Sequence, residues 1–519
     1  MEVGRINGID CGLTPDEIGC YVTEQIQKRF DQWVGRTKED PSSFGLIERE
    51  ALEFSREIAG LIAAAILSDD KVKEGVEEEA KRIRKESAEK LRYVRSTWLA
   101  ITLLCGLTFS IYTSYWLPIR DRRKAGRRRG VGKRGKEGAG IYPELAALGI
   151  REGASTPLRE EVSRTTIFMP SFELSRQDLS RRGVDLDVKT VRRLTLELGE
   201  EALSARKMDV QLWREGKFPA SNAFRGKRVV VAIDGGRVRT RENRPGRKTG
   251  KGRHRFETPW REPKLLVIYV VDGKGRRDAS EEQIMEIGMQ GPEQIAELAA
   301  FHLHRLGAAE AKEVVFLADG AEWIWDRVPM IARQAGLVKW LAGLDFCHAM
   351  GYVGKAVKAT CEGKALRKAH VKQVRRALLD GRFDDALQKL QSLPGANATE
   401  EVLDAMRYMK KRRALMKYDL LVAKGLPIGS GAVESGVRRV INLRIKSPGM
   451  FWEKDNVESI MYLRANALSG QWENMLKRVY KHTRTTRRRD WKWNLTPYSS
   501  KAEDNNKYKL SQLIIKEAA

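Results

Sequence analysis

The sequence predicts an α/β protein in which a mixed five-stranded sheet, covered by helices, is interrupted by an all-helical insertion and preceded by a mainly helical region. From about residue 226, three strands are expected in close succession, the third a short return strand after the turn at Asp272-Gly273. Helical patterns at 280–309 and from Trp323 to Ala335 each precede one further apolar run. Residues 350–425 have apolar residues at helical spacing almost throughout. These observations place the sheet before a long helical segment, after which the chain returns to the sheet through a helix.

The composition indicates a large basic protein that binds a polyanion. The 519 residues include 96 lysines and arginines against 69 acidic residues, a net charge of +27. Such an excess of positive charge is most often found in proteins that bind nucleic acid, although a merely soluble basic protein is the simpler alternative. The charge is concentrated in three blocks, at 120–136, 237–255 and 477–494. Clustering of this kind favours the nucleic-acid interpretation.

The five cysteines form no CxxC pair and no closely spaced framework, which argues against a zinc ribbon or a disulfide scaffold. The N-terminus is charged and lacks an apolar core followed by a cleavage site, so no signal peptide is expected. A reducing cytoplasm is the expected compartment.

The first 225 residues contain three expected elements. Residues 12–95 have the spacing of amphipathic helices. Residues 98–119 carry no charge and are long enough for a membrane helix, but LTFSIYTSYW alternates with period two and Cys105-Gly106 suits a turn. We therefore expect a buried β-hairpin and no membrane segment. A helix ending near Gly183, the turn VDLD and a following helix resemble a helix-turn-helix. The DNA-binding candidates on that second helix are Lys189, Arg192 and Arg193.

Two acidic residues end apolar runs of the expected sheet in the same way. VVVAIDGG ends at Asp234 on the first strand, and VVFLADGA ends at Asp319 on the fourth strand. In a mixed sheet these strands can be neighbours, which would bring the two carboxylates together. A third acid, Glu434, lies in the first turn of an expected helix after the glycine-rich segment PIGSG. Taken singly, an Asp-Gly turn or a helix-terminal glutamate is ordinary; the three in this order indicate a shared site.

Three carboxylates suit the transfer of a phosphoryl group. Two Mg²⁺ ions roughly 4 Å apart stabilise the attacking and leaving oxygens of an in-line displacement. Mg²⁺ prefers hard oxygen ligands and shares its coordination with water and substrate phosphate. We therefore expect Asp234, Asp319 and Glu434 to be catalytic and to hold two Mg²⁺ or Mn²⁺ ions.

The segments AIDGG, LADGAEWIW, GLDFCHA and PIGSGAVESGVRRVINLRIKSPGMFW, in this order, resemble the DDE transposases of bacterial insertion sequences, and in particular the Mutator-like group with a helical insertion. The DxxH element of that group is matched by Asp345 and His348. The resemblance covers about residues 225–475. It implies an RNase H-like catalytic domain that cuts the ends of a mobile element and joins them to target DNA.

The resemblance also implies partners: double-stranded DNA of the terminal inverted repeats and of the target, and a homodimer or higher oligomer on that DNA. Two other functions remain open at this point. One is a catalytically inactive DNA-binding protein descended from a transposase, and the other is an endonuclease on the same scaffold.

Supporting residues are expected around the three acids. His348 either contacts DNA near the scissile bond or is a structural hydrogen-bond donor. Arg438, four residues after Glu434, either pairs with it or binds phosphate. The basic loop after Asp234 is expected to hold flanking DNA through Arg247, Lys248 and Arg253.

The expected regions are therefore a helical region (1–95), a β-hairpin with a basic run (96–150), a helix-turn-helix-like region (151–225), the catalytic domain in two parts (226–349 and 426–475) around the helical insertion (350–425), and a basic C-terminal tail (476–519).

Overall fold

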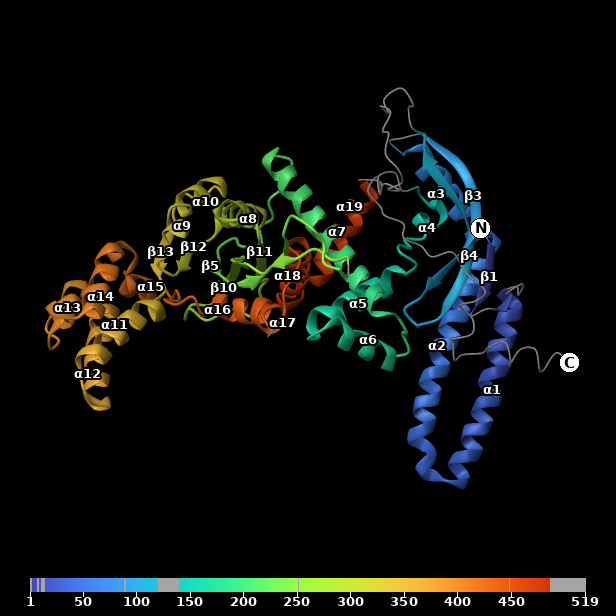
Figure 1. The fold of residues 1–519 in the computed structure, drawn as a ribbon, viewed down its shortest axis with the longest axis horizontal. Helices are drawn as coiled ribbons and strands as arrows, with labels where there is room; N and C mark the ends of the chain where they lie inside the picture. The colour runs from blue at the N-terminus through green and yellow to red at the C-terminus, as the bar shows by residue number, and fades with distance from the viewer. Residues whose placement is uncertain are drawn as a thin grey trace. The chain divides into compact units, whose positions relative to one another are not determined.

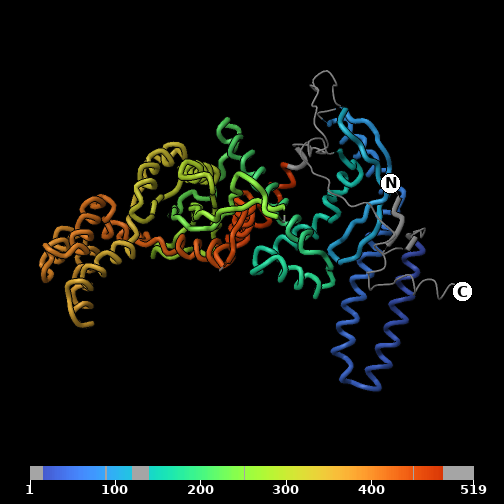
Figure 2. Tube along the Cα trace, in the orientation of Figure 1, coloured from blue at the N-terminus to red at the C-terminus, as the bar shows by residue number. Residues whose placement is uncertain are grey.

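The computed structural model describes residues 2–6, 9–10, 15–87, 90–119, 140–250, 252–447 and 449–485. The chain divides into two compact units, one of Met1–Leu198 with Tyr480–Ala519 and one of Gly199–Val479 (Figures 1 and 2). Helix α7 (Val188–Arg214) has residues in both units. The basic run 120–136 and residues 486–494 of the run 477–494 lie outside the described residues.

The first unit combines a four-stranded antiparallel sheet with helices. The strands lie in the order β2-β1-β4-β3. Their bounds are β1 (Glu2–Ile6), β2 (Ile9–Asp10), β3 (Leu91–Thr102) and β4 (Thr108–Pro118). The helices are α1 (Pro15–Glu39), the short η1 (Pro41–Ser43), α2 (Phe44–Ser68), α3 (Asp70–Lys85), α4 (Pro143–Ala147), α5 (Thr156–Phe168) and α6 (Phe172–Arg181).

The hairpin expected in the apolar segment 98–119 is confirmed. Strands β3 and β4 pair antiparallel from Leu91 opposite Pro118 to Thr102 opposite Thr108. Gly106 in the turn has a φ of +87°, and a Cβ there would lie 1.8 Å from the carbonyl oxygen of Gly183. Only glycine meets both conditions. In the part of the chain that the structure describes, no helix combines the length and the apolar character needed to cross a membrane.

Two details of the N-terminal prediction are wrong. The expected boundary between residues 95 and 96 falls inside β3, because the strand begins among charged residues whose side chains are mostly exposed. Strand β1, which pairs with β4, was missed because its partner lies about a hundred residues away in the sequence. The helical region therefore also contributes strands to a sheet.

The two helices and the turn of the expected helix-turn-helix are present. Helix α6 ends at Arg181, and Gly183 follows with a φ of +82°. The N–H of Val184 donates to Leu179 O at 3.0 Å, which closes the helix end as a glycine C-cap does. Asp187 accepts from the N–H groups of Lys189 and Thr190 at the start of α7. Seven buried residues form the core of this region: Ala154, Leu158, Val162, Leu179, Val184, Val191 and Leu194.

The second unit is built on the expected mixed five-stranded sheet, which is confirmed. The strands lie in the order β11-β10-β5-β12-β13. β10 pairs antiparallel with β5 and β11, whereas β12 pairs parallel with β5 and β13. The bounds are β5 (Arg228–Gly235), β10 (Lys264–Val271), β11 (Ile284–Gly288), β12 (Glu313–Ala318) and β13 (Leu341–Leu344).

Two elements of this sheet differ from the prediction. The return strand lies at β11, inside the segment 280–309 that was expected to be helical, and helix α8 (Pro292–Arg305) begins only after it. All five residues of β11 are buried, including Glu286. The segment therefore lacks the alternation of buried and exposed positions from which a strand is predicted. The helix expected from Trp323 to Ala335 is two helices, α9 (Glu322–Trp325) and α10 (Val328–Gln334). Pro329 lies in the first turn of the second helix, where it is favoured.

The chain also forms short strands in and after the basic loop, and several helices after the sheet. In the basic loop 237–255 and the residues just after it, β6 (Val238–Arg239) pairs with β9 (Trp260–Arg261), and β7 (Glu242–Asn243) pairs with β8 (Phe256–Glu257). After the sheet come α16 (Gly431–Val437), the π-helical turn η5 (Arg438–Asn442), α17 (Leu443–Ile445), α18 (Lys454–Leu468) and α19 (Trp472–Thr485); the short η2 (Ala308–Glu310) precedes β12.

Residues 346–423 are helical and have a core of their own. The segment comprises α11 (Phe346–Thr360), α12 (Lys364–Leu379), α13 (Phe383–Gln391), η3 (Ala396–Ala398), α14 (Glu400–Lys411), η4 (Arg413–Leu415) and α15 (Tyr418–Ala423). Their buried side chains form one cluster and those of the sheet and its covering helices form another. In Figure 1 these helices extend from the end of β13.

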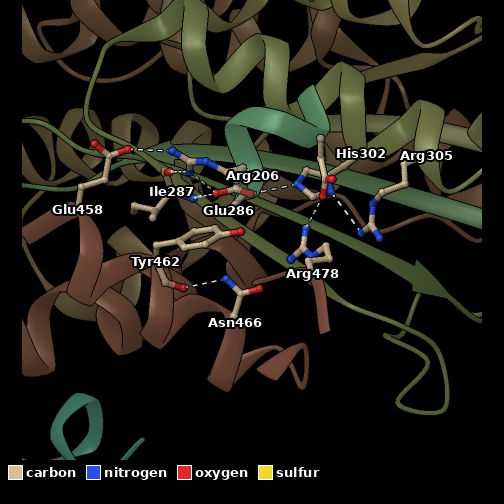
Figure 3. A network of polar contacts seen from close by, with 10 residues as sticks. Arg206, Glu286, Ile287, His302, Arg305, Glu458, Tyr462, Asn466 and Arg478 are labelled. Carbon is tan, nitrogen blue, oxygen red and sulfur yellow. Dashed lines mark hydrogen bonds and ion pairs between the residues drawn. The ribbon is translucent and has the colours of Figure 1, made fainter. Parts of the chain in front are cut away.

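A buried polar network joins the edge strand β11 to the helices around it (Figure 3). Arg206 on α7 donates to Glu286 Oε1 and to Ile287 O, each at 2.7 Å, and to Glu458 on α18 at 3.0 Å. His302 on α8 lies 3.0 Å from the other oxygen of Glu286. Since a buried ionic group needs all its partners, this network fixes α7, α8 and α18 against the sheet.

Candidate active site

The structure brings Asp234 and Asp319 to the same edge of the sheet. Strands β5 and β12 are neighbours and run parallel, with Ala318 opposite Ile233. Asp234 directly follows Ile233, and Asp319 directly follows Ala318. Both aspartate side chains are partly buried. The N–H of Gly235 donates to Asp234 Oδ1 at 2.7 Å, and the N–H of Ala321 donates to Asp319 Oδ1 at 2.9 Å. Neighbouring parallel strands therefore present two oriented carboxylates side by side.

Helix α16 brings Glu434 to this edge. Gly436 lies on the opposite side of the helix from solvent, and a Cβ there would come within 2.7 Å of Leu265 on β10. Leu265 is the register partner of Asp234. The absence of a side chain at Gly436 thus lets α16 lie directly on the strands that carry the first aspartate. Glu434 keeps 49% of its side chain exposed.

Asp345 ties the end of β13 to the loop before α16. It caps α11, where the N–H of His348 donates to its Oδ1 at 2.6 Å. Its Oδ2 accepts from the N–H of Ser430 and from Ser430 Oγ, the latter at 2.6 Å. The side chain is only 1% exposed. Both oxygens are thus used inside the protein, and they set the position of the loop that leads to Glu434.

His348 lies between two carboxylates. Its Nδ1 is 3.3 Å from Asp345 Oδ1 and 3.7 Å from Glu434 Oε1. Possible ligand atoms of Asp345, His348 and Glu434 all lie within 4.8 Å of one another. By distance alone, these three residues form a possible metal site, and it differs from the set Asp234, Asp319 and Glu434 expected from the sequence.

The surroundings of His348 favour its protonated form. The hydrogen bond to Asp345, reinforced by the charges of Asp345, Asp319 and Glu434, raises the pKa of His348 to about 9. A metal that bound through His348 would therefore have to displace a proton from the ring. Burial alone would raise the pKa of Asp345, but its hydrogen bonds from His348 and Ser430 hold it below its usual range.

The remaining carboxylates have the character of a cation site. Burial raises the pKa of Asp234, and although the N–H of Gly235 opposes this, the nearby charges of Asp319 and Glu434 add to it. Carboxylates that repel one another bind a shared divalent cation favourably, because it removes their repulsion. Asp234, Asp319 and Glu434 offer the oxygen ligands that Mg²⁺ and Mn²⁺ prefer, whereas among the described residues the group of three with ligand atoms within 4.8 Å of one another is Asp345, His348 and Glu434.

Two further residues at this edge were missed from the sequence. Arg412 donates from Nε and Nη2 to the carbonyl oxygen of Gly320, at 3.0 and 2.6 Å, directly after Asp319. Its guanidinium lies over the ring of Tyr408, which stacks on Tyr352 at a centroid distance of 3.9 Å. The run RYMKKRR was the available signal, but nothing in it indicated contact with a strand distant in the sequence. These residues attach the helices after β13 to the loop that carries Asp319.

The other predicted site residues are placed as follows. Lys189 and Arg192 are exposed on α7, whereas Arg193 lies 3.4 Å from Glu152 in an ion pair. Three loop residues are exposed between β7 and β8: Arg247, Lys248 and Arg253.

Arg438 is exposed, and in the described part of the chain it forms no ion pair with Glu434. The N–H of Arg438 donates to Glu434 O, so the α-helical turn between the two residues is intact and only their side chains are unpaired with each other. The expected pairing of these two side chains is therefore not observed.

No protein-family model and no curated protein matches the sequence. Among solved structures, the chain is similar to the Drosophila P element transposase strand transfer complex, with 10% identity over 63% of this chain and 80% of that chain and a TM-score of 0.23. These values establish no family, so the site is interpreted from its own residues.

Proposed function

We propose that this protein is a DNA transposase of the bacterial insertion-sequence kind, which binds the ends of its element and catalyses metal-dependent strand cleavage and strand transfer. The observation that carries the proposal is the meeting of Asp234 and Asp319 at the ends of two neighbouring parallel strands, with Glu434 brought onto the same strands by α16. The order of these acids along the chain is that of the DDE transposases that the sequence resembles.

The three carboxylates fit two divalent ions. Ions bound there would supply the charge that stabilises the attacking and leaving oxygens of the phosphodiester. Glu434, half exposed on a helix that rests on β10, is accessible to a substrate phosphate. The net charge of +27 supports binding of the DNA itself.

The other residues of the site orient these acids and balance their charge. Asp345 holds the segment that contains Ser430 and thereby positions Glu434. The imidazolium of His348 lies beside Asp345 and Glu434 and offsets part of their negative charge. As a donor with two N–H groups, it is also suited to contact a phosphate oxygen of the DNA.

The proposal is tested with duplex DNA taken from both sides of the gene, including any inverted repeats, mixed with the full-length protein, Mg²⁺ and a supercoiled target plasmid. We expect cuts at the repeat ends and covalent products in which those ends are joined to the plasmid. Both products should be absent with EDTA and with Asp234→Asn.

The competing functions give different products in the same assay. Cleavage without joined products would identify an endonuclease instead. Specific binding of the ends without cleavage, in Mg²⁺ and in Mn²⁺, would identify a catalytically inactive DNA-binding protein.

A further inference from the structure

We propose that the exposed face of helix α12 (Lys364–Leu379) binds the phosphate backbone of duplex DNA that leads away from the active site. The inference names the surface that holds this DNA and rests on the proposed function. The helix belongs to the segment after β13 and packs beside α11 (Figure 1).

The cations of α12 are concentrated on one side of the helix. Val374, Ala377 and Leu378 are buried and define the inner side. The exposed cations on the other side are Lys364, Lys368, Lys372, Arg375 and Arg376. At 3.6 residues per turn they share an arc of about 120°. This face of the helix is therefore a continuous row of positive charge.

Little within the protein neutralises this row. The sixteen residues of α12 include no aspartate or glutamate. Among the described residues, no carboxylate lies within 4.0 Å of Lys364, Lys368, Lys372 or Arg375, while Arg376 is 3.8 Å from Asp380. By contrast, the arginines of nearby helices are paired, as Arg382 is with Asp385 and Arg413 with Asp384.

Like charges four residues apart on a helix repel and destabilise it. The row on α12 therefore does not contribute to the stability of the helix. An external anion explains why this surface keeps such repulsion. For a protein that acts on DNA, that anion is the phosphate backbone, whose charges are regularly spaced.

The row begins next to the active site. The guanidinium of Arg375 lies 5.6 Å from the ring centroid of Phe346, which follows Asp345 and is the first residue of α11. From Arg375 to Lys364 the row extends about 16 Å, at 1.5 Å per residue. Successive lysines are about 6 Å apart along the axis, a spacing at which each can meet its own phosphate. A duplex held at the acidic residues can thus continue along α12.

The test compares two triple variants of the full-length protein with the same net charge. The first is Lys364→Glu with Lys368→Glu and Lys372→Glu. The matched control is Lys274→Glu with Lys312→Glu and Lys339→Glu, three exposed lysines that precede or follow strands at the opposite edge of the sheet from Asp234 and Asp319. Affinity for a long duplex carrying an element end is measured by fluorescence anisotropy without Mg²⁺, at several salt concentrations.

We expect the α12 variant to bind at least about tenfold more weakly at 0.15 M salt, and its plot of log affinity against log salt to be shallower by about 2 to 3 units, since each phosphate contact contributes about 0.9. The control should change that slope by less than one unit. With a duplex shortened on the side that reaches α12, the variant and the wild type should bind equally.

Three results would overturn the inference: equal slopes for the two triple variants, an unchanged difference on the shortened duplex, or equally effective competition by duplex RNA. If the charge reversal disturbs folding, as shown by circular dichroism, the corresponding lysine-to-glutamine variant repeats the comparison. Because binding is measured without metal, it is independent of catalysis. Wild-type binding along α12 together with no cleavage after Mg²⁺ or Mn²⁺ is added would refute the proposed function while leaving this inference intact.

Discussion

At the scale of single residues, Asp345 acts through its neighbours. It is buried and accepts hydrogen bonds from Ser430 and His348 with both oxygens. It therefore has little capacity left to hold a metal, and its effect on catalysis is the placement of Glu434. Partners of this kind, one step removed from the ligands, typically change metal affinity or activity by 10- to 100-fold.

We predict that Asp345→Asn lowers cleavage by about 10- to 100-fold at a fixed Mg²⁺ concentration and raises the Mg²⁺ concentration needed for half-maximal activity. The amide keeps the size of the side chain but loses charge and one acceptor. Activity is measured over a Mg²⁺ titration, with DNA affinity and thermal stability determined on the same preparation. A loss of activity with an unshifted Mg²⁺ midpoint would contradict a positioning role.

His302 illustrates a buried group whose protonation the fold opposes. Burial lowers the pKa of His302 to about 4, although its hydrogen bond to Glu286 opposes this. Burial alone would raise the pKa of Glu286, but the charge of Arg206 outweighs it, and the pKa falls to about 2. We interpret His302 as neutral, donating from Nε2 to Glu286 while Nδ1 accepts from Arg305 at 3.3 Å (Figure 3).

Since the pKa of His302 is lower in the folded than in the unfolded state, stability is full above pH 6.5 and is lost as the pH falls from 6.5 toward 4. From the two pKa values, the loss is about 2 to 3 kcal/mol at pH 4.5. We predict that His302→Gln removes this part of the pH dependence. Hydrogen exchange of the amides in β11 and α8 at pH 7 and pH 4.5 measures it; an equal decline in the variant and the wild type would refute the assignment.

At the scale of elements, helix α7 presents two different kinds of basic residue at its start. Lys189 and Arg192 are exposed, while Arg193 is engaged with Glu152. The sequence grouped all three as DNA-binding residues because a helical pattern shows the spacing of cations but not how exposed each of them is in the fold. The structure therefore assigns them different expected effects.

We predict that Lys189→Ala with Arg192→Ala weakens binding of element ends by about tenfold and makes it less sensitive to salt, as expected when phosphate or base contacts are removed. Arg193→Ala should lower the thermal stability of the N-terminal unit and have a smaller effect on affinity. Binding curves at two salt concentrations and thermal melts distinguish these effects. Unchanged affinity in the double variant would place DNA recognition elsewhere, for example in the basic run 120–136.

At the scale of the whole molecule, the sequence was most informative where the signal is local. The buried strands that end at Asp234 and Asp319, the hairpin around Gly106 and the helices from 350 to 425 are each marked by periodicity or a turn residue. The neighbouring positions of the two aspartates then follow from the order of strands in a mixed sheet.

Features that depend on distant partners could not be predicted. Strand β1 gains its structure by pairing with β4, and β11 is fully buried with an internal glutamate that Arg206 neutralises. The link from Asp345 to Ser430 and the contact of Arg412 with Gly320 join segments more than eighty residues apart. None of these contacts produces a periodic pattern in the sequence, because each is made at a single point of the fold between segments that are distant in the chain.

The most direct test of the account is strand cleavage and joining by Asp319→Asn, measured together with its binding to element ends. If Asp319 shares divalent ions with Asp234 and Glu434, the variant should bind the ends with an affinity within a few-fold of wild type, since lysines and arginines make the phosphate contacts. Cleavage and joining should both fall by about a thousandfold or more, equivalent to about 4 kcal/mol of lost transition-state stabilisation. Strand transfer at a rate close to wild type would contradict the central claim that these three carboxylates form the catalytic site.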